Sequence, residues 1–294
     1  MTLDSALALT RGSPLGLANL VSQLNPVNST CTGVYDSENG ASVSVIGQMR
    51  YPLGSRTARL TFLAPADCDD LTAFSTLLEF LAYQAGAWQA YHLVGEVDEH
   101  SRVYEALRGA GFSVYAWQRI WRLTANELPS SVPESSPWRA AEDVDGVAIH
   151  NLYQMVVPGL MQPMEPLKEG RQDGLVYHEK GELMAYASII AGPLGIWVQP
   201  FVHPSVSAVT NVLLSLVGRL QRKPERPVYI CIRSYQAWLE SALENVCATC
   251  GERQALMARR LVAVQKVSER LRLPVLEKGS PEMPAPMARL KPRT

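Results

Sequence analysis

The sequence has little cysteine and almost no net charge, and each shortage excludes a class of protein. Five cysteines among 294 residues are odd in number and mostly sit in apolar surroundings, which favours a reducing compartment over a disulfide framework. The 27 basic and 28 acidic side chains nearly cancel, so no general field attracts nucleic acid or an anionic membrane. We therefore expect neither of these partners.

The sequence also shows neither the pattern of an export signal nor that of a membrane-spanning segment. No basic stretch followed by a long apolar core opens the sequence, and Asp4 interrupts its first residues, so we expect a cytoplasmic protein. The range Leu183–Gly218 holds 36 residues without an acidic or basic side chain, as a membrane span would. However, Pro193, Pro200 and Pro204 cut it into pieces too short to cross a bilayer. We expect a strand, a turn, a strand and a helix there.

Two stretches of the sequence, 139 positions apart, follow the same pattern. Leu60 to Pro65 is an apolar, β-prone run that ends in proline, and Gln199 to Pro204 is another. Each is followed by an apolar stretch of about fifteen residues with helical spacing, then by a short strand, a second helix and a final strand. A repeat of this length predicts two copies of one α/β unit.

The repeat and the composition together predict the domain organisation. We expect two tandem domains of α/β (α+β) type, each with a mixed, mostly antiparallel sheet flanked by helices. The first spans residues 1–124, a linker rich in Ser, Pro and Glu spans 125–137, and the second spans 138–264. Residues 265–294 carry five prolines and a net positive charge, which predicts a disordered tail. Such a tail either touches RNA or an acidic partner or only aids solubility.

The same pattern places the individual elements. In the first unit we expect strands at 6–10, 41–51, 56–64, 91–97 and 113–123, with helices at 15–24, 70–84 and 101–109. In the second unit we expect strands at 138–141, 175–178, 182–190, 195–202, 228–233 and 254–264, with helices at 144–157, 206–220 and 236–248.

The element order and two short motifs resemble the GNAT superfamily of N-acetyltransferases. The run from Tyr104 to Phe112, Tyr-Glu-Ala-Leu-Arg-Gly-Ala-Gly-Phe, is similar to the end of the fourth helix of that family. Val202-His203-Pro204 is similar to the Val-x-Pro that closes its fourth strand. The resemblance covers both units and implies a tandem GNAT-like protein with acetyl-CoA as cofactor and a small-molecule amine as acceptor.

In this family a Gly-rich motif opens the helix after the fourth strand, so that backbone N–H groups approach the pyrophosphate of acyl-CoA. The motif is degenerate in both units. The first unit has Cys68, Asp69 and Leu71 at the matching positions, and its acidic residues would repel a pyrophosphate. The second unit has small, uncharged residues there, which suit either cofactor binding or an ordinary core helix. The resemblance thus assigns cofactor binding to Val202, His203, Ser205, Ser207, Ala208 and Thr210.

The chemistry of the family needs a proton donor and a base. A tyrosine four residues before the Gly of Gly-Phe is the usual donor, and Leu107 fills that position here. We therefore assign the acid to Tyr104, three residues earlier, and the base to Glu96. Two functions stay open: an N-acyltransferase, and a catalytically inactive GNAT-fold protein that binds small molecules or proteins.

Two further expectations concern metals and assembly. Cys247 and Cys250 have the spacing of a redox or zinc pair, but no second pair or nearby His completes four ligands, so we expect no metal site. Two units in one chain can satisfy the pseudo-symmetric contact that single-unit relatives make by dimerising, so we expect a monomer.

Overall fold

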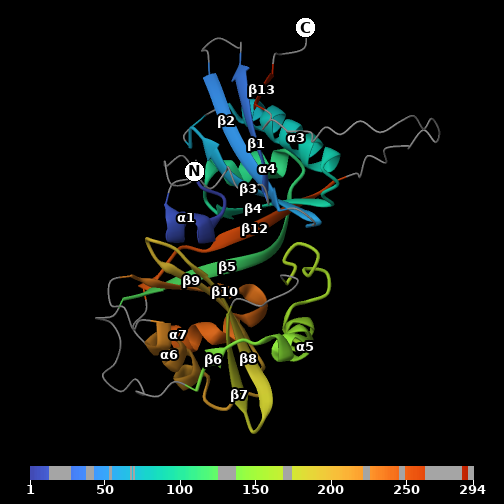
Figure 1. Cartoon of the computed structure of the whole chain (residues 1–294). Helices are drawn as coiled ribbons and strands as arrows, with labels where there is room; N and C mark the ends of the chain where they lie inside the picture. The colour runs from blue at the N-terminus through green and yellow to red at the C-terminus, as the bar shows by residue number, and fades with distance from the viewer. Residues whose placement is uncertain are drawn as a thin grey trace, which may run out of the picture.

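The computed structural model describes residues 1–12, 28–37, 43–52, 55–66, 68, 70–124, 137–167, 174–220, 226–244, 249–261 and 287–290. We call residues 1–124 the first half and residues 137–261 the second half. The strands of both halves, together with one strand at 287–290, join in one mixed sheet of thirteen strands, with helices on its faces (Figure 1). The fold is therefore α+β, built on one continuous sheet.

The first half opens with a helix and continues with an antiparallel meander. Its elements are α1 (Ser5–Arg11), β1 (Asn28–Ser37), β2 (Val43–Pro52), β3 (Thr57–Ala64), α3 (Leu71–Ala87), β4 (His92–Asp98), α4 (Arg102–Gly109) and β5 (Ser113–Leu123).

The second half has the same order of three antiparallel strands, helix, strand, helix and closing strand. Its elements are β6 (Arg139–Ala140), a 3-10 helix (Asp143–Asp145), α5 (Gly146–Val156), β7 (Gly174–Glu179), β8 (Glu182–Ala191), β9 (Ile196–Val202), α6 (Val209–Leu220), β10 (Val228–Arg233), a second 3-10 helix (Ser234–Leu239), α7 (Glu240–Glu244), β11 (Thr249–Cys250) and β12 (Gln254–Arg260).

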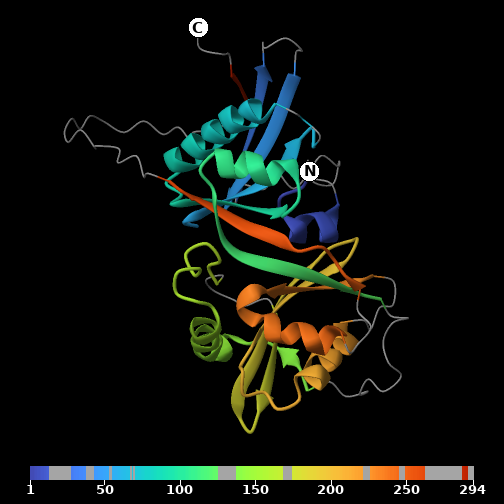
Figure 2. The same ribbon diagram turned by 180° about the vertical axis from the view of Figure 1, so that it is seen from behind.

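The two halves exchange their closing strands. β12 ends the second half but pairs with β4 of the first half, and β5 ends the first half but pairs with β10 of the second. β12 and β5 also pair with each other, so the centre of the sheet runs β4-β12-β5-β10 with every neighbour antiparallel. Both strands cross between the halves in the two opposite views of Figures 1 and 2. Neither half completes its sheet without a strand of the other.

Each half also contains one pair of parallel strands that separate along their length. β3 and β4 pair only from Thr57 to Arg59, and beyond Arg59 the two strands diverge. β9 and β10 likewise pair only from Ile196 to Val198. We call these places the first separation (β3/β4) and the second separation (β9/β10). At each separation, backbone N–H and C=O groups of the two strands no longer pair with each other. They therefore need other hydrogen-bond partners.

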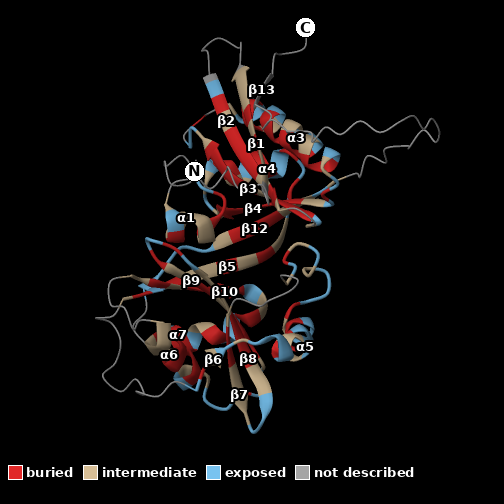
Figure 3. Cartoon of the chain, viewed as in Figure 1, coloured by how far each residue is buried: buried red, intermediate tan, exposed pale blue. Residues whose placement is uncertain are grey.

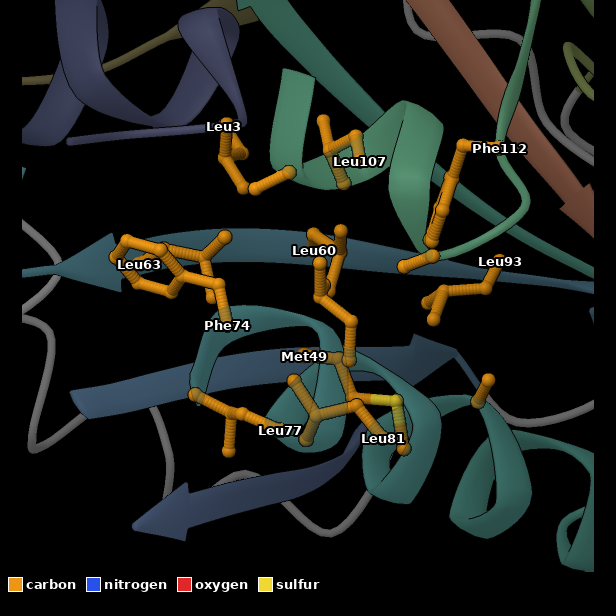
Figure 4. Close-up of a cluster of buried hydrophobic side chains, with 14 of the residues drawn as sticks. Leu3, Met49, Leu60, Leu63, Phe74, Leu77, Leu81, Leu93, Leu107 and Phe112 are labelled. Carbon is orange, nitrogen blue, oxygen red and sulfur yellow. The ribbon is translucent and has the colours of Figure 1, made fainter. Parts of the chain in front are cut away.

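The hydrophobic core of the first half lies between the sheet and α3 with α4. Asp70 begins α3, because its carboxylate accepts hydrogen bonds from the backbone N–H of Thr72 and Ala73. The apolar residues of α3 then recur at helical spacing and turn one face to the strands, as the close-up in Figure 4 shows for Phe74, Leu77 and Leu81. Buried positions run along the central strands, whereas the outer side of α5 is exposed (Figure 3).

The sequence predicted most elements within a few residues, but three differ. The expected strand at 6–10 is wrong, because these residues lie in α1, where the carboxylate of Asp4 caps the backbone N–H of Leu7. Strand β1 was not predicted at all. The expected helix at 236–248 begins as a 3-10 helix at Ser234 and continues as α7 to Glu244, and its last four expected residues lie outside the described residues. The expected helix at 15–24 lies outside the described residues.

One short strand lies within the basic tail. Met287–Leu290 forms β13, which pairs in parallel with β1 and so covers an edge of the sheet. Among the residues that the structure describes, no helix has the length and apolar character needed to cross a bilayer.

Candidate functional site

A row of four polar side chains crosses the centre of the sheet, one from each of the four central strands. Asp98, Gln254, Gln118 and Arg233 are opposite one another in register. Gln254 Nε2 donates to Asp98 Oδ1 over 3.0 Å, and Gln118 Nε2 donates to Gln254 Oε1 over 2.7 Å. A guanidinium N–H of Arg233 donates to Gln118 Oε1. The row therefore links the first half to the second through hydrogen bonds between side chains.

The second-half end of this row is a buried ion pair. Arg233 Nε lies 3.2 Å from Glu165 Oε2, and the two side chains expose 4% and 6% of their surface. The hydroxyl of Tyr235 donates to the same oxygen over 3.1 Å, and Gln199 Nε2 does so over 3.4 Å. In contrast, Glu165 Oε1 is buried and has no hydrogen-bond partner among the residues that the structure describes. A buried acceptor without a donor is costly, so this oxygen marks a place for a ligand N–H or O–H.

On the first-half side of the row, Glu96 also contacts Gln118. Its Oε2 accepts hydrogen bonds from the backbone N–H of Ser5 over 3.0 Å and from Gln118 Nε2 over 3.1 Å. The guanidinium of Arg59 lies 3.9 Å from Glu96 Oε1. Glu96 is therefore joined to the buried ion pair of the second half through Gln118.

Burial and nearby carboxylates keep the side-chain hydroxyls of Tyr235 and Tyr115 protonated. Burial, and then the charge of Glu165, raise the pKa of Tyr235 far above its ordinary value. Burial also raises the pKa of Tyr115 far above its ordinary value, with the charge of Glu165 as the next cause. Both hydroxyls thus stay protonated over the whole working pH range.

The backbone of the segment from Met1 to Leu3 fills the first separation. Leu3 N donates to Thr61 O, Leu63 N donates to Met1 O, and Glu96 N donates to Leu3 O, so the segment joins β3 to β4. The Leu3 side chain lies beside Leu107 and over Leu60 in the core (Figure 4). No room is left for an extended ligand arm at this place, because backbone and a buried side chain occupy it.

A single side chain bridges the second separation. Gln236 Oε1 accepts a hydrogen bond from Val202 N over 2.9 Å, and Gln236 Nε2 donates to Pro200 O over 2.8 Å. Its amide thus satisfies backbone groups of β9 that face β10. A side-chain amide can rotate away, whereas the main chain in the first separation cannot leave without breaking several backbone bonds.

The start of α6 is open and lined by small residues. Ser207 and Ala208 are exposed, and α6 begins at Val209, three residues later than expected. Ser205 N donates to His203 Nδ1 over 3.1 Å, which orders the turn before the helix. The Ser207 hydroxyl donates to Glu179 over 3.2 Å, so one carboxylate lies beside this helix start.

These features fit acyl-CoA in part. The second separation and the open helix start offer the backbone donors that a pantetheine arm and a pyrophosphate require. Gln236 would have to move, and Glu179 opposes a phosphate charge. The first half does not fit, because its separation is filled and Asp70 caps α3.

The structure places the two predicted catalytic residues in different surroundings. Glu96 is buried in the polar cluster, as described above. Tyr104 lies half-buried on α4, packed against the first-half core, with the Arg108 guanidinium 6.0 Å from its ring centroid. Leu107 is fully buried. Within the described residues, no hydrogen bond joins Tyr104 to Glu96.

Cysteine and metal chemistry have no support in the described part of the chain. Cys31, Cys68 and Cys231 are buried free thiols, and Cys250 is an exposed one. Burial raises the pKa of the Cys231 thiol to about 12, so it is no nucleophile. Cys247 lies outside the described residues. Among these residues, no group of three His, Cys, Asp or Glu side chains has a spacing that could hold a metal ion.

Sequence reasoning missed Glu165, Arg233 and the two glutamines. A signal was present for three of them, because Gln118 lies inside a strand and Arg233 and Gln254 lie at the ends of strands, and a polar residue that becomes buried there requires a partner. Glu165 gave no signal, since it lies in a Pro-containing loop 68 residues before Arg233.

Two solved structures have a fold similar to the one described above. A GCN5-related N-acetyltransferase from Sphaerobacter thermophilus is 12% identical, with 76% of this chain and 79% of that chain covered and a TM-score of 0.51. A tandem GNAT protein from the clavulanic acid biosynthesis pathway is 17% identical, with 87% and 93% covered and a TM-score of 0.50. The sequence matches no protein-family model and no curated protein. The chain therefore has the GNAT acetyltransferase fold, and these identities show the fold alone.

Proposed function

We propose that this protein is a GNAT-fold N-acyltransferase that holds acetyl-CoA in its second half and acetylates a small-molecule amine. The observation that supports this is the buried carboxylate of Glu165 in the polar cluster next to the second separation. Its Oε1 lacks a donor, and the ammonium group of an acceptor supplies one. The second separation, whose strand β9 leads to the open start of α6, and a group suited to an amine thus occur together.

The residues that would hold the cofactor follow from the geometry. We place the pyrophosphate at the start of α6, where Ser207, Ala208 and Thr210 keep bulk away from the backbone N–H groups. Val202, His203 and Ser205 would line the pantetheine arm after Gln236 has turned away from Val202 N. Acetyl-CoA, when bound, supplies the activated acetyl group.

The chain's own residues would handle the protons. Glu165 Oε1 is the group that takes the proton which an acceptor ammonium must lose before it can attack. Tyr235, which stays protonated, donates to Glu165 Oε2 and holds the carboxylate in place. Glu96 connects to this pair through Gln118, so we retain it as a proposed member of the site. Tyr104 remains a prediction.

We also infer that the halves are two copies of one unit. Their elements follow the same order, and each parallel strand pair holds for three residues before it separates. Because the copies already exchange strands with each other, we propose that the protein works as a monomer.

Thr210→Glu is expected to lower the affinity for acetyl-CoA at least tenfold. The substitution puts a negative charge at the second residue of α6, against the phosphates, at a cost of about 1–4 kcal/mol. Thr72→Glu is the matched control, since Thr72 is the second residue of α3 in the first half. Thermal shift with acetyl-CoA provides the measurement, because a ligand at a hundred times its Kd stabilises by about 2.7 kcal/mol.

Normal binding by a folded Thr210→Glu variant would move the site away from α6. Loss of binding by Thr72→Glu instead would place it in the first half.

The second candidate function is a GNAT-fold binding protein without catalysis. Gln236 favours it, because its amide already makes the two β9 hydrogen bonds that a pantetheine arm would need. A wild-type melting curve that saturating acetyl-CoA leaves unmoved would favour this candidate over the enzyme.

A further inference from the structure

Arg59, a basic residue of the first half, lies on the same face of the sheet as the loop that carries Glu165. The Thr57 hydroxyl donates to Pro163 O of that loop over 2.8 Å. Arg59 follows Thr57 by two residues, so both side chains leave β3 on the same side. Glu96 Oε1, 3.9 Å from the Arg59 guanidinium, is also on that side. Arg59 of the first half and Glu165 of the second half therefore face the same region.

Arg59 is held loosely in comparison with Arg233. The 3.9 Å separation from Glu96 exceeds hydrogen-bond distance, and within the described residues its guanidinium makes no hydrogen bond. Arg59 keeps 29% of its side chain exposed, so a ligand can reach it. Arg233, in contrast, is buried and donates to both Glu165 and Gln118. Arg59 thus has donors free for an anion, in the planar arrangement that suits a carboxylate.

Four charged side chains act on the phenol of Tyr115, and their charges balance without a ligand. Glu96 and Glu165 bring two negative charges, and Arg59 and Arg233 bring two positive charges. A ligand with only an ammonium group would leave one uncompensated charge in this buried place, which is costly. A ligand that carries an ammonium and a carboxylate preserves the balance.

We propose that the acceptor is a small amino acid, whose ammonium group binds Glu165 Oε1 and whose carboxylate binds the guanidinium of Arg59. This rests on the proposed function, since it names the acceptor of that same site. The first half then contributes to the site itself: it supplies the specificity for the carboxylate, while the second half supplies the amine-binding group. The loop held by Thr57 brings the two groups together.

Calorimetry on the full chain, with and without coenzyme A, tests this directly. The tightest-binding amino acid of a panel of the twenty is compared with its amide, which lacks the carboxylate, and with the matching acid that lacks the amine. Both analogues are expected to bind at least tenfold more weakly. Arg59→Met should weaken the amino acid by about 10- to 100-fold and leave the amide unchanged. Arg56→Met is the control, because Arg56 is exposed and its guanidinium lies 5.7 Å from the ring centroid of Tyr91.

Glu165→Gln provides a second variant, nearly equal in shape, and should weaken the amino acid and the amide alike. The inference is overturned if no amino acid binds, if the amide binds as tightly as its parent, or if Arg59→Met binds normally. Acetyl transfer to amines without a carboxylate would overturn it and leave the proposed function standing. An amino acid that binds through Arg59 to a protein that ignores acetyl-CoA would support the site and refute the acyltransferase.

Discussion

Replacing Arg233 by methionine is expected to lower the free energy of unfolding by about 3–5 kcal/mol. The guanidinium is the charged partner of Glu165 in a place where both side chains are almost completely buried. Its removal leaves a buried carboxylate without compensation and also removes a donor from Gln118. Because the row through Gln118 crosses the centre of the sheet, both halves should lose stability together.

Urea unfolding followed by tryptophan fluorescence measures this loss. The double variant Arg233→Met/Glu165→Gln is the control, since it removes both charges and should recover a large part of the stability. A single variant within about 1 kcal/mol of the wild type would contradict the buried ion pair. So would a double variant as unstable as the single one.

Leu3→Ala should cost about 2–5 kcal/mol. Only 1% of Leu3 is exposed, and its side chain packs in the first-half core at the first separation. Its removal leaves a cavity between strands that the segment from Met1 to Leu3 holds together, and main-chain bonds keep the segment from collapsing inward.

Leu71→Ala is the matched control, because the Leu71 side chain begins α3 at the surface and should lose less than about 1 kcal/mol. Equal losses for the two variants in chemical denaturation would mean that Leu3 does not fill the first separation.

The sequence indicated the strands but not their exchange between the halves. The limits of β5 and β10 followed from apolar patterning and agree with the structure. Strand exchange did not follow, because β5 and β12 bury the same faces whichever half supplies their neighbour. The helix α1 was misread since Ala6–Thr10 is apolar, although Asp4 as a cap and the Ala and Leu residues favour a helix.

The candidate site was accessible to sequence reasoning only in part. Glu96 was named as a base, and the structure places it in the buried cluster. The pairing of Glu165 with Arg233 depends on a loop folding over the sheet, which no local pattern encodes. That Gln236 bridges the second separation was equally hidden, since a glutamine after a strand is ordinarily solvated.

Isothermal titration of the wild-type chain with acetyl-CoA shows where the cofactor binds, because the stoichiometry distinguishes the two halves. We expect one molecule bound per chain, in the second half, since only the Gln236 side chain blocks the second separation. Two molecules per chain would contradict the filling of the first separation by the segment from Met1 to Leu3, and no binding at all would refute the acyltransferase.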